Sequence, residues 1–123
     1  MSVAPRRTPV PEEVIRDRRE RGIDGHDEVW DGDYVMSPIA GYEHQDLCNE
    51  FGAVLSVLIR WAGLGRVFEG YNVGDRDVGW TTNFRVPDVA VFLNGNPSLG
   101  ADSQAVGGPD FLVEILSDDD PAA

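Results

Sequence analysis

The chain of 123 residues has no lysine, a single cysteine and no long apolar stretch. With Cys48 alone, no disulfide can form within the chain, which fits a reduced, cytoplasmic setting. The longest apolar stretch, FGAVLSVLI, is far shorter than the roughly 20 residues of a transmembrane helix. The N-terminus also lacks the apolar region of a signal peptide. We therefore expect no association with a membrane.

Positive charge is scarce outside the N-terminal segment. All ten basic residues are arginine, and the formal net charge is −12. Residues 1–21 contain six arginines and four acids, whereas residues 22–123 contain four arginines and eighteen acids. The excess of acids in residues 22–123 repels a phosphate backbone. A nucleic-acid partner would have to be bound through a metal ion or a second subunit.

What is present indicates one globular domain of the α+β class, or α/β in a truncated form. Hydrophobic residues make up 41% of the chain, which is typical of a folded core. We interpret residues 1–25 as an N-terminal arm with a short, solvated helix, and residues 26–123 as the domain. The expected elements are a helix over 11–22, a hairpin over 28–36 that turns at Asp31-Gly32, a helix over 42–63, and strands over 66–74, 83–94 and 109–117.

The long helix is predicted from apolar residues that recur every three or four positions. These residues are Leu47, Phe51, Val54, Leu55, Leu58, Ile59 and Ala62. His44 lies on the N-terminal extension of the same stripe. Its ring is therefore expected to point inward or to the rim of the core.

Two acids, Asp88 and Glu114, lie inside strands that are otherwise apolar. A buried, ionised carboxylate is costly unless it is paired, hydrogen-bonded or bound to a metal, and no lysine is available as a partner. If the two strands are neighbours, the carboxylates either share a proton or bind a hard cation such as Mg²⁺. The structural alternative is that Asp88 marks a strand end and Glu114 an exposed edge.

Pro87-Asp88, followed after 25 residues by Glu114-Ile115-Leu116, resembles the PD-(D/E)xK nuclease pattern. The segments EVWDGDYVMSP, EHQDL, FRVPDVAVF and GGPDFLVEILSDDD are similar to the Uma-two family of restriction-endonuclease-like proteins, over residues 26–120. The resemblance implies a restriction-endonuclease-like fold, a long helix packed on a mixed sheet. It also implies DNA as the substrate, with Asp88 and Glu114 as ligands of Mg²⁺ or Mn²⁺. His44 matches a histidine that helps to shape the site, or else is a capped, partly buried histidine.

The lysine of the general pattern is absent, because Leu116 stands two residues after Glu114. In the resembling family this lysine usually lies on a later helix, and we expect that helix and a further strand to be missing here. Asp118, Asp119 and Asp120 are interpreted as a solvated tail. Three functions follow: a magnesium-dependent endonuclease weakened by the missing lysine, a non-catalytic fragment, or an interaction module. The interaction module would use the exposed edge of the last strand, where a second copy of the chain would be one partner.

Overall fold

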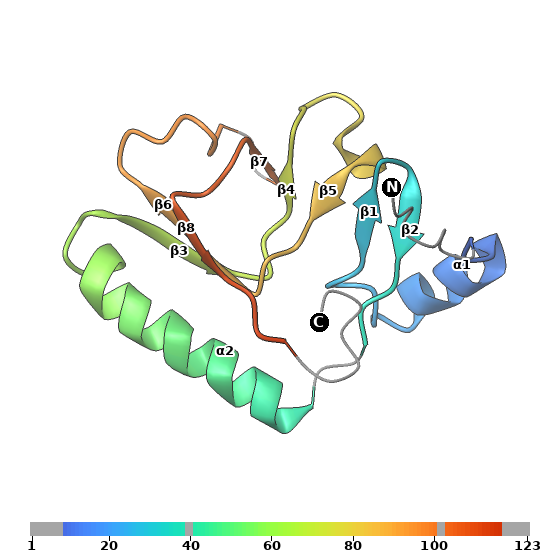
Figure 1. The fold of residues 1–123 in the computed structure, drawn as a ribbon, viewed down its shortest axis with the longest axis horizontal. Coiled ribbons are helices and arrows are strands. Elements are labelled where there is room, and N and C mark those ends of the chain that lie inside the picture. The colour runs from blue at the N-terminus through green and yellow to red at the C-terminus, as the bar shows by residue number, and fades with distance from the viewer. Residues whose placement is uncertain (1–8, 39–40, 101–102, 117–123) are drawn as a thin grey trace, which may run out of the picture.

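The computed structural model describes residues 9–38, 41–100 and 103–116, which form a mixed α/β fold of two sheets and one long helix (Figure 1). The first elements are α1 (Glu12–Glu20), β1 (Glu28–Trp30), β2 (Asp33–Val35) and α2 (Tyr42–Leu55), which continues as a π-helical turn (Ser56–Arg60). They are followed by β3 (Gly65–Glu69), β4 (Val73–Gly74), a 3₁₀ turn (Trp80–Thr82), β5 (Phe84–Arg85), β6 (Val89–Leu93), β7 (Ala105–Val106) and β8 (Phe111–Val113).

Helix α2 packs on the antiparallel sheet β3-β6-β8, as the sequence predicts (Figure 1). Its contact with the sheet consists of Leu55 and Ile59 against a cluster formed by Val67, Val89, Val91 and Val113. The predicted apolar stripe is wider than this contact. Leu47, Phe51, Val54 and Leu58 of the same helix are exposed.

Strand β6 is central in its sheet and is buried on both faces from Val89 to Phe92. Its second face carries Ala90 and Phe92, which pack with Phe68, Tyr71 and Ala105. Apolar residues therefore follow one another in β6 without alternation, as expected of a strand covered on both sides.

The second sheet has the order β2-β1-β5-β4-β7 and is mixed, because β4 and β7 run parallel while the other pairs are antiparallel. The hairpin β1–β2 turns at Asp31 and Gly32, with φ values of 48° and 89°. These are the positive φ values that the Asp-Gly pair predicts.

The predicted strand over 83–94 is wrong, because β5 and β6 belong to different sheets. Residues 86–88 cross between them, and Pro87, which has no N–H to donate, occupies this break in the ladder. The predicted strand over 66–74 is divided in the same way into β3 and β4, with Gly70 at φ 65° in between. The expected strand over 109–117 is shorter, since β8 ends before Glu114.

The short helix α1 is exposed over most of its surface but is fixed to the domain through Arg18. The Arg18 guanidinium donates to both carboxylate oxygens of Asp27 at 2.7 Å, and to the carbonyl oxygen of Ser37 at 3.0 Å. Asp27 also accepts hydrogen bonds from the Tyr34 hydroxyl at 2.6 Å and from the Ser37 N–H at 2.8 Å.

In the described ranges, neither helix combines the length and the apolar character that crossing a bilayer would require.

Candidate functional site

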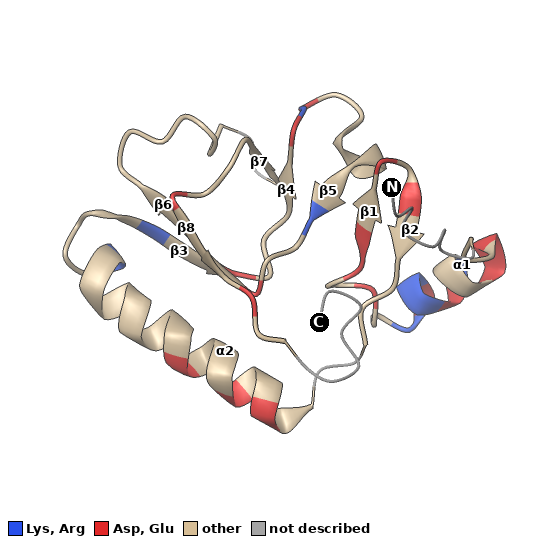
Figure 2. Ribbon diagram, viewed as in Figure 1, with Lys and Arg blue, Asp and Glu red and all other residues tan. Residues whose placement is uncertain are grey.

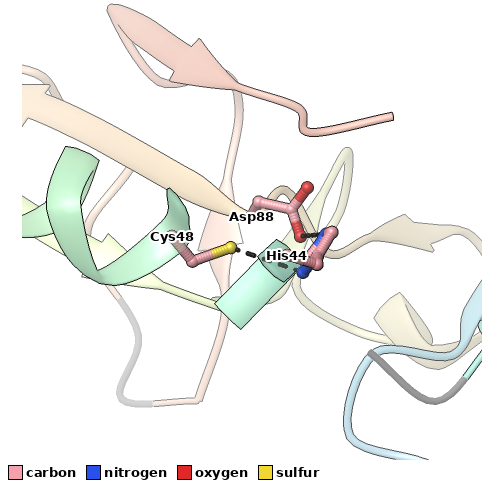
Figure 3. Close-up of side chains that lie close together, drawn as sticks. All are labelled: His44, Cys48 and Asp88. Carbon is pink, nitrogen blue, oxygen red and sulfur yellow. Dashed lines mark hydrogen bonds and ion pairs between the residues drawn. The ribbon is translucent and has the colours of Figure 1, made fainter. Parts of the chain in front are cut away.

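Asp88 lies where three elements of the fold meet, and its side chain is buried (8% exposed). Its Oδ1 is 3.3 Å from Nε2 of His44 on α2 (Figure 3). Its Oδ2 accepts a hydrogen bond of 2.8 Å from the N–H of Ile115, just beyond β8. Its backbone carbonyl accepts one of 3.2 Å from Gly70, just beyond β3. The buried carboxylate is thus satisfied, as a buried charge requires.

Helix α2 supplies two side chains to this point, His44 and Cys48. They are four residues apart, so they lie on the same face one turn from each other. The Sγ of Cys48 is 3.6 Å from Nδ1 of His44, and the imidazole therefore lies between the thiol and Asp88 (Figure 3). The half-buried position of His44 confirms the expectation that its ring points to the rim of the core.

Glu114 follows β8 directly and lies next to the start of β6, because Val113 pairs with Val89. The strands that carry the two predicted acids are therefore neighbours, which is the condition on which a shared site depends. Glu114 itself is exposed, so it does not sit in an apolar row as the sequence indicated.

A third carboxylate, Glu69, ends β3 on the other side of β6, where it pairs with Val89. A Cβ built at Gly52 of α2 would lie 3.0 Å from Oε2 of Glu69. The absence of a side chain at Gly52 therefore makes room for this carboxylate against the helix, one turn after Cys48.

The three carboxylates act together on Cys48. Burial raises the pKa of its thiol to about 11, and the negative charges of Asp88, Glu69 and Glu114 contribute to the increase. The thiol is therefore protonated near neutral pH. Although Cys48, His44 and Asp88 have the order of a nucleophile, a base and an orienting acid, a buried thiol with a raised pKa is a poor nucleophile.

The same residues are well suited to bind a cation. Ligand atoms of His44, Cys48 and Asp88 all lie within 4.8 Å of one another. The carboxylates of Asp88, Glu69 and Glu114 concentrate negative charge around them, as the raised pKa of Cys48 shows. Oxygen donors of this kind fit Mg²⁺ or Mn²⁺.

The structure brings His44 and Asp88 into contact, whereas Glu114, directly beyond the neighbouring strand, is not among the residues whose ligand atoms lie within 4.8 Å of one another. Two further residues near Asp88, Cys48 and Glu69, were not predicted from the sequence. The spacing of four residues between His44 and Cys48 was a usable signal for Cys48. Glu69 lies inside the strand predicted over 66–74, so the signal that identified Asp88 was present there too. The predicted acidic tail, 118–120, lies outside the described residues.

Comparisons with known proteins identify the family and the fold. The model of the family Uma2, described as "Putative restriction endonuclease", matches residues 13–121. The fold is similar to that of a crystal structure from Anabaena variabilis ATCC 29413, described as a "putative nuclease belonging to DUF820". The two chains are 21% identical with a TM-score of 0.63.

That match covers 76% of this chain and 52% of the Anabaena chain, so this chain spans about half the length of that protein. A comparison with curated proteins gives no match. The family match extends over most of the chain and contains every residue of the site described above. The chain belongs to the Uma2 family.

Proposed function

We propose that the chain carries the metal-binding centre of a nuclease that hydrolyses phosphodiester bonds in DNA. The observation that supports this most strongly is the buried carboxylate of Asp88, with Glu114 beside it on the neighbouring strand. Membership of the Uma2 family gives the reaction class. The fold is also that of a protein described as a nuclease.

Asp88 and Glu114 are the proposed ligands of Mg²⁺ or Mn²⁺. When bound, such an ion polarises a phosphoryl oxygen and lowers the pKa of a coordinated water. The hydrogen bond from Ile115 and the contact with His44 each engage one oxygen of Asp88. A carboxylate has about four lone-pair positions, so Asp88 keeps capacity for a cation while its orientation is fixed.

The charge distribution makes the metal necessary for binding DNA. Acidic residues lie on α2 and where β3 and β8 end, and basic residues lie on α1, β3 and β5, at the far end of the long helix and in the loop after β4 (Figure 2). A divalent cation would reduce the repulsion between this surface and a phosphate group. Hydrolysis should be slow, because loss of one electrostatic donor in an active site costs about 10²–10³ in rate, and position 116 holds leucine instead of lysine.

Nicking of supercoiled plasmid DNA with Mg²⁺ or Mn²⁺ tests the proposal. Asp88→Asn and Glu114→Gln keep the shape of each side chain and remove its charge. We expect each to reduce the rate about a hundredfold, the size of effect seen for a lost electrostatic group. Asp46→Asn, an equally conservative change at an exposed position of α2, should nick like the wild type. Equal rates in all four proteins would refute the proposal.

A second variant tests the role of the missing lysine. Leu116 is 57% exposed, so lysine can replace it without disturbing the core. Leu116→Lys should raise the nicking rate at least about tenfold, less than the 10²–10³ of an optimally placed electrostatic donor because the new side chain is not preorganised. Val78→Lys, at a position that is 92% exposed, adds the same charge elsewhere and controls for general attraction of DNA. An equal increase in both variants would contradict a specific role for position 116.

A further inference from the structure

Cys48 gives the site a donor that the proposed hydrolysis does not use. It is the only cysteine of the chain and is buried, with its sulfur against the imidazole of His44. Mg²⁺ and Mn²⁺ take oxygen ligands in preference to thiolate. The thiol is therefore unexplained by the proposed nuclease chemistry.

We propose that His44, Cys48 and Asp88 bind a borderline-soft divalent cation of the Zn²⁺ class. One imidazole nitrogen, the thiolate and one carboxylate oxygen supply three ligands, and a fourth position stays open to water, as in tetrahedral sites of this ion. On binding, the S–H bond is replaced by an S–metal bond and the thiol proton passes to water. The inference does not require that the chain cleave DNA.

One donor atom from each of the three residues lies within 4.8 Å of the other two, close enough for a bound ion to draw them together. Bonds of about 2.0–2.3 Å in a tetrahedron place neighbouring ligand atoms about 3.3–3.7 Å apart. The contact of Cys48 Sγ with His44 measures 3.6 Å, and that of Asp88 Oδ1 with His44 measures 3.3 Å. These two contacts involve different ring nitrogens, so the imidazole must reorient to direct one nitrogen at the ion.

The surroundings favour a cation as well. Glu69 ends β3 and Glu114 follows β8, so both neighbours of β6 carry a carboxylate near the end at which Asp88 lies. Their negative charges attract a divalent ion, which brings the compensating charge that a thiolate needs here. Because Asp88 is also a proposed ligand of Mg²⁺, an ion of the Zn²⁺ class would exclude Mg²⁺ from the site.

Titration of the metal-free chain with Co²⁺ tests the inference without DNA. Co²⁺ takes the place of Zn²⁺ and reports a thiolate ligand through a sulfur-to-cobalt charge-transfer band in the near ultraviolet. We expect this band in the wild type, its loss in Cys48→Ser, and its bleaching when Zn²⁺ displaces Co²⁺. Circular dichroism checks that each variant is folded.

Competition with Zn²⁺ then gives affinities. Even groups that only support a metal ligand are worth about 10–100-fold in affinity, so Cys48→Ser and His44→Gln should each weaken Zn²⁺ binding at least tenfold. Asp46→Asn on the exposed side of α2 should leave it unchanged.

The absence of the charge-transfer band in the wild type, or equal Zn²⁺ affinity in folded Cys48→Ser, would overturn the inference. Failure of plasmid nicking alone would instead count against the proposed hydrolysis. The two proposals can therefore fail separately.

Discussion

Asp27 is the buried carboxylate that holds the N-terminal helix in place. Its side chain is 3% exposed, and that of its partner Arg18 is 13% exposed. Tyr34 completes the group, and burial together with the hydrogen bond to Asp27 raises the pKa of its phenol to about 12. The phenol therefore stays protonated over the whole neutral range and can donate to the carboxylate.

Replacement of Asp27 by asparagine should destabilise the protein strongly. The change leaves the Arg18 guanidinium largely buried without its counter-ion, and breaking a buried pair in this way costs about 3–5 kcal/mol. The free energy of unfolding in urea measures the loss. Asp17→Asn is the matched control, because it removes a pair with Arg21 whose two side chains are 59% and 63% exposed.

The control should lose less than about 1 kcal/mol, as exposed pairs do. Equal losses for Asp27→Asn and Asp17→Asn would show that burial does not determine the strength of the Arg18–Asp27 pair.

The same carboxylate predicts a dependence of stability on pH. Burial by itself raises the pKa of Asp27, but the hydrogen bonds from Arg18, Ser37 and Tyr34 outweigh it and hold the pKa below the ordinary value of 3.8. Above pH 3.8, Asp27 is ionised in both the folded and the unfolded chain, and its interactions contribute their full stabilisation to the fold. As the pH falls below this value, the unfolded chain takes up the proton first, so the free energy of unfolding decreases until the pH reaches the folded-state pKa.

The difference in unfolding free energy between wild type and Asp27→Asn should therefore shrink as the pH falls below 3.8. Urea unfolding at a series of acidic pH values measures it. Asp75 and Asp110 also have lowered pKa values, but they are present in both proteins and their effect cancels. If the difference in unfolding free energy stays constant until acid unfolds both proteins, Asp27 does not have a lowered pKa in the folded state.

The members of the site differ in how far the sequence could reveal them. His44 follows from the helical period, and Asp88 from the rule that a buried charge needs a partner. Cys48 is different, because a small apolar-like residue in a helix is ordinarily just core. Its closeness to Asp88 depends on which turn of α2 faces the start of β6, and that is set by packing against Val89 and Val91.

The hairpin β1–β2 depends on one backbone conformation that glycine adopts easily. Gly32 has φ 89°, and its N–H donates to the carbonyl oxygen of Thr82 at 2.8 Å, which docks the hairpin on the 3₁₀ turn Trp80–Thr82. A Cβ at Gly32 would meet no atom within 4 Å. The cost of Gly32→Ala is therefore backbone strain alone, about 1–2 kcal/mol for a left-handed residue.

Gly25→Ala provides the comparison for urea unfolding, because a Cβ there also meets nothing and the residue has no positive φ. It should be neutral, or slightly stabilising through the loss of freedom in the unfolded chain. A loss at Gly25 as large as that at Gly32 would contradict the conformational explanation.

Local signals predicted the elements well wherever contacts between neighbours in sequence decide the structure. The Asp31-Gly32 turn and the period of α2 are of this kind. The division of residues 83–94 between two sheets is not determined by such local contacts. It depends on the pairing of Phe84 with Val29 and of Val89 with Glu69, which lie far away in sequence. Pro87 marked the position of the break, but nothing local shows that the chain changes sheets there.

The protein as a whole exposes many large apolar side chains, which gather on one strand and one helix. Strand β8 contributes Phe111 (54% exposed) and Leu112 (47%), and it pairs with β6 on only one side among the described strands. Helix α2 contributes Leu47, Phe51, Val54, Val57 and Leu58.

We propose that a second copy of the chain pairs with the free edge of β8. An edge strand presents unpaired N–H and carbonyl groups in a row, and apolar residues on it favour pairing with another chain. Sedimentation velocity over a range of concentrations should show a dimer for the wild type and a monomer for Leu112→Lys, because lysine on an edge opposes pairing. Val78→Lys adds the same charge at a remote, exposed position and should remain dimeric. If Leu58→Lys on α2 yields the monomer while Leu112→Lys does not, the helix and not the strand forms the contact.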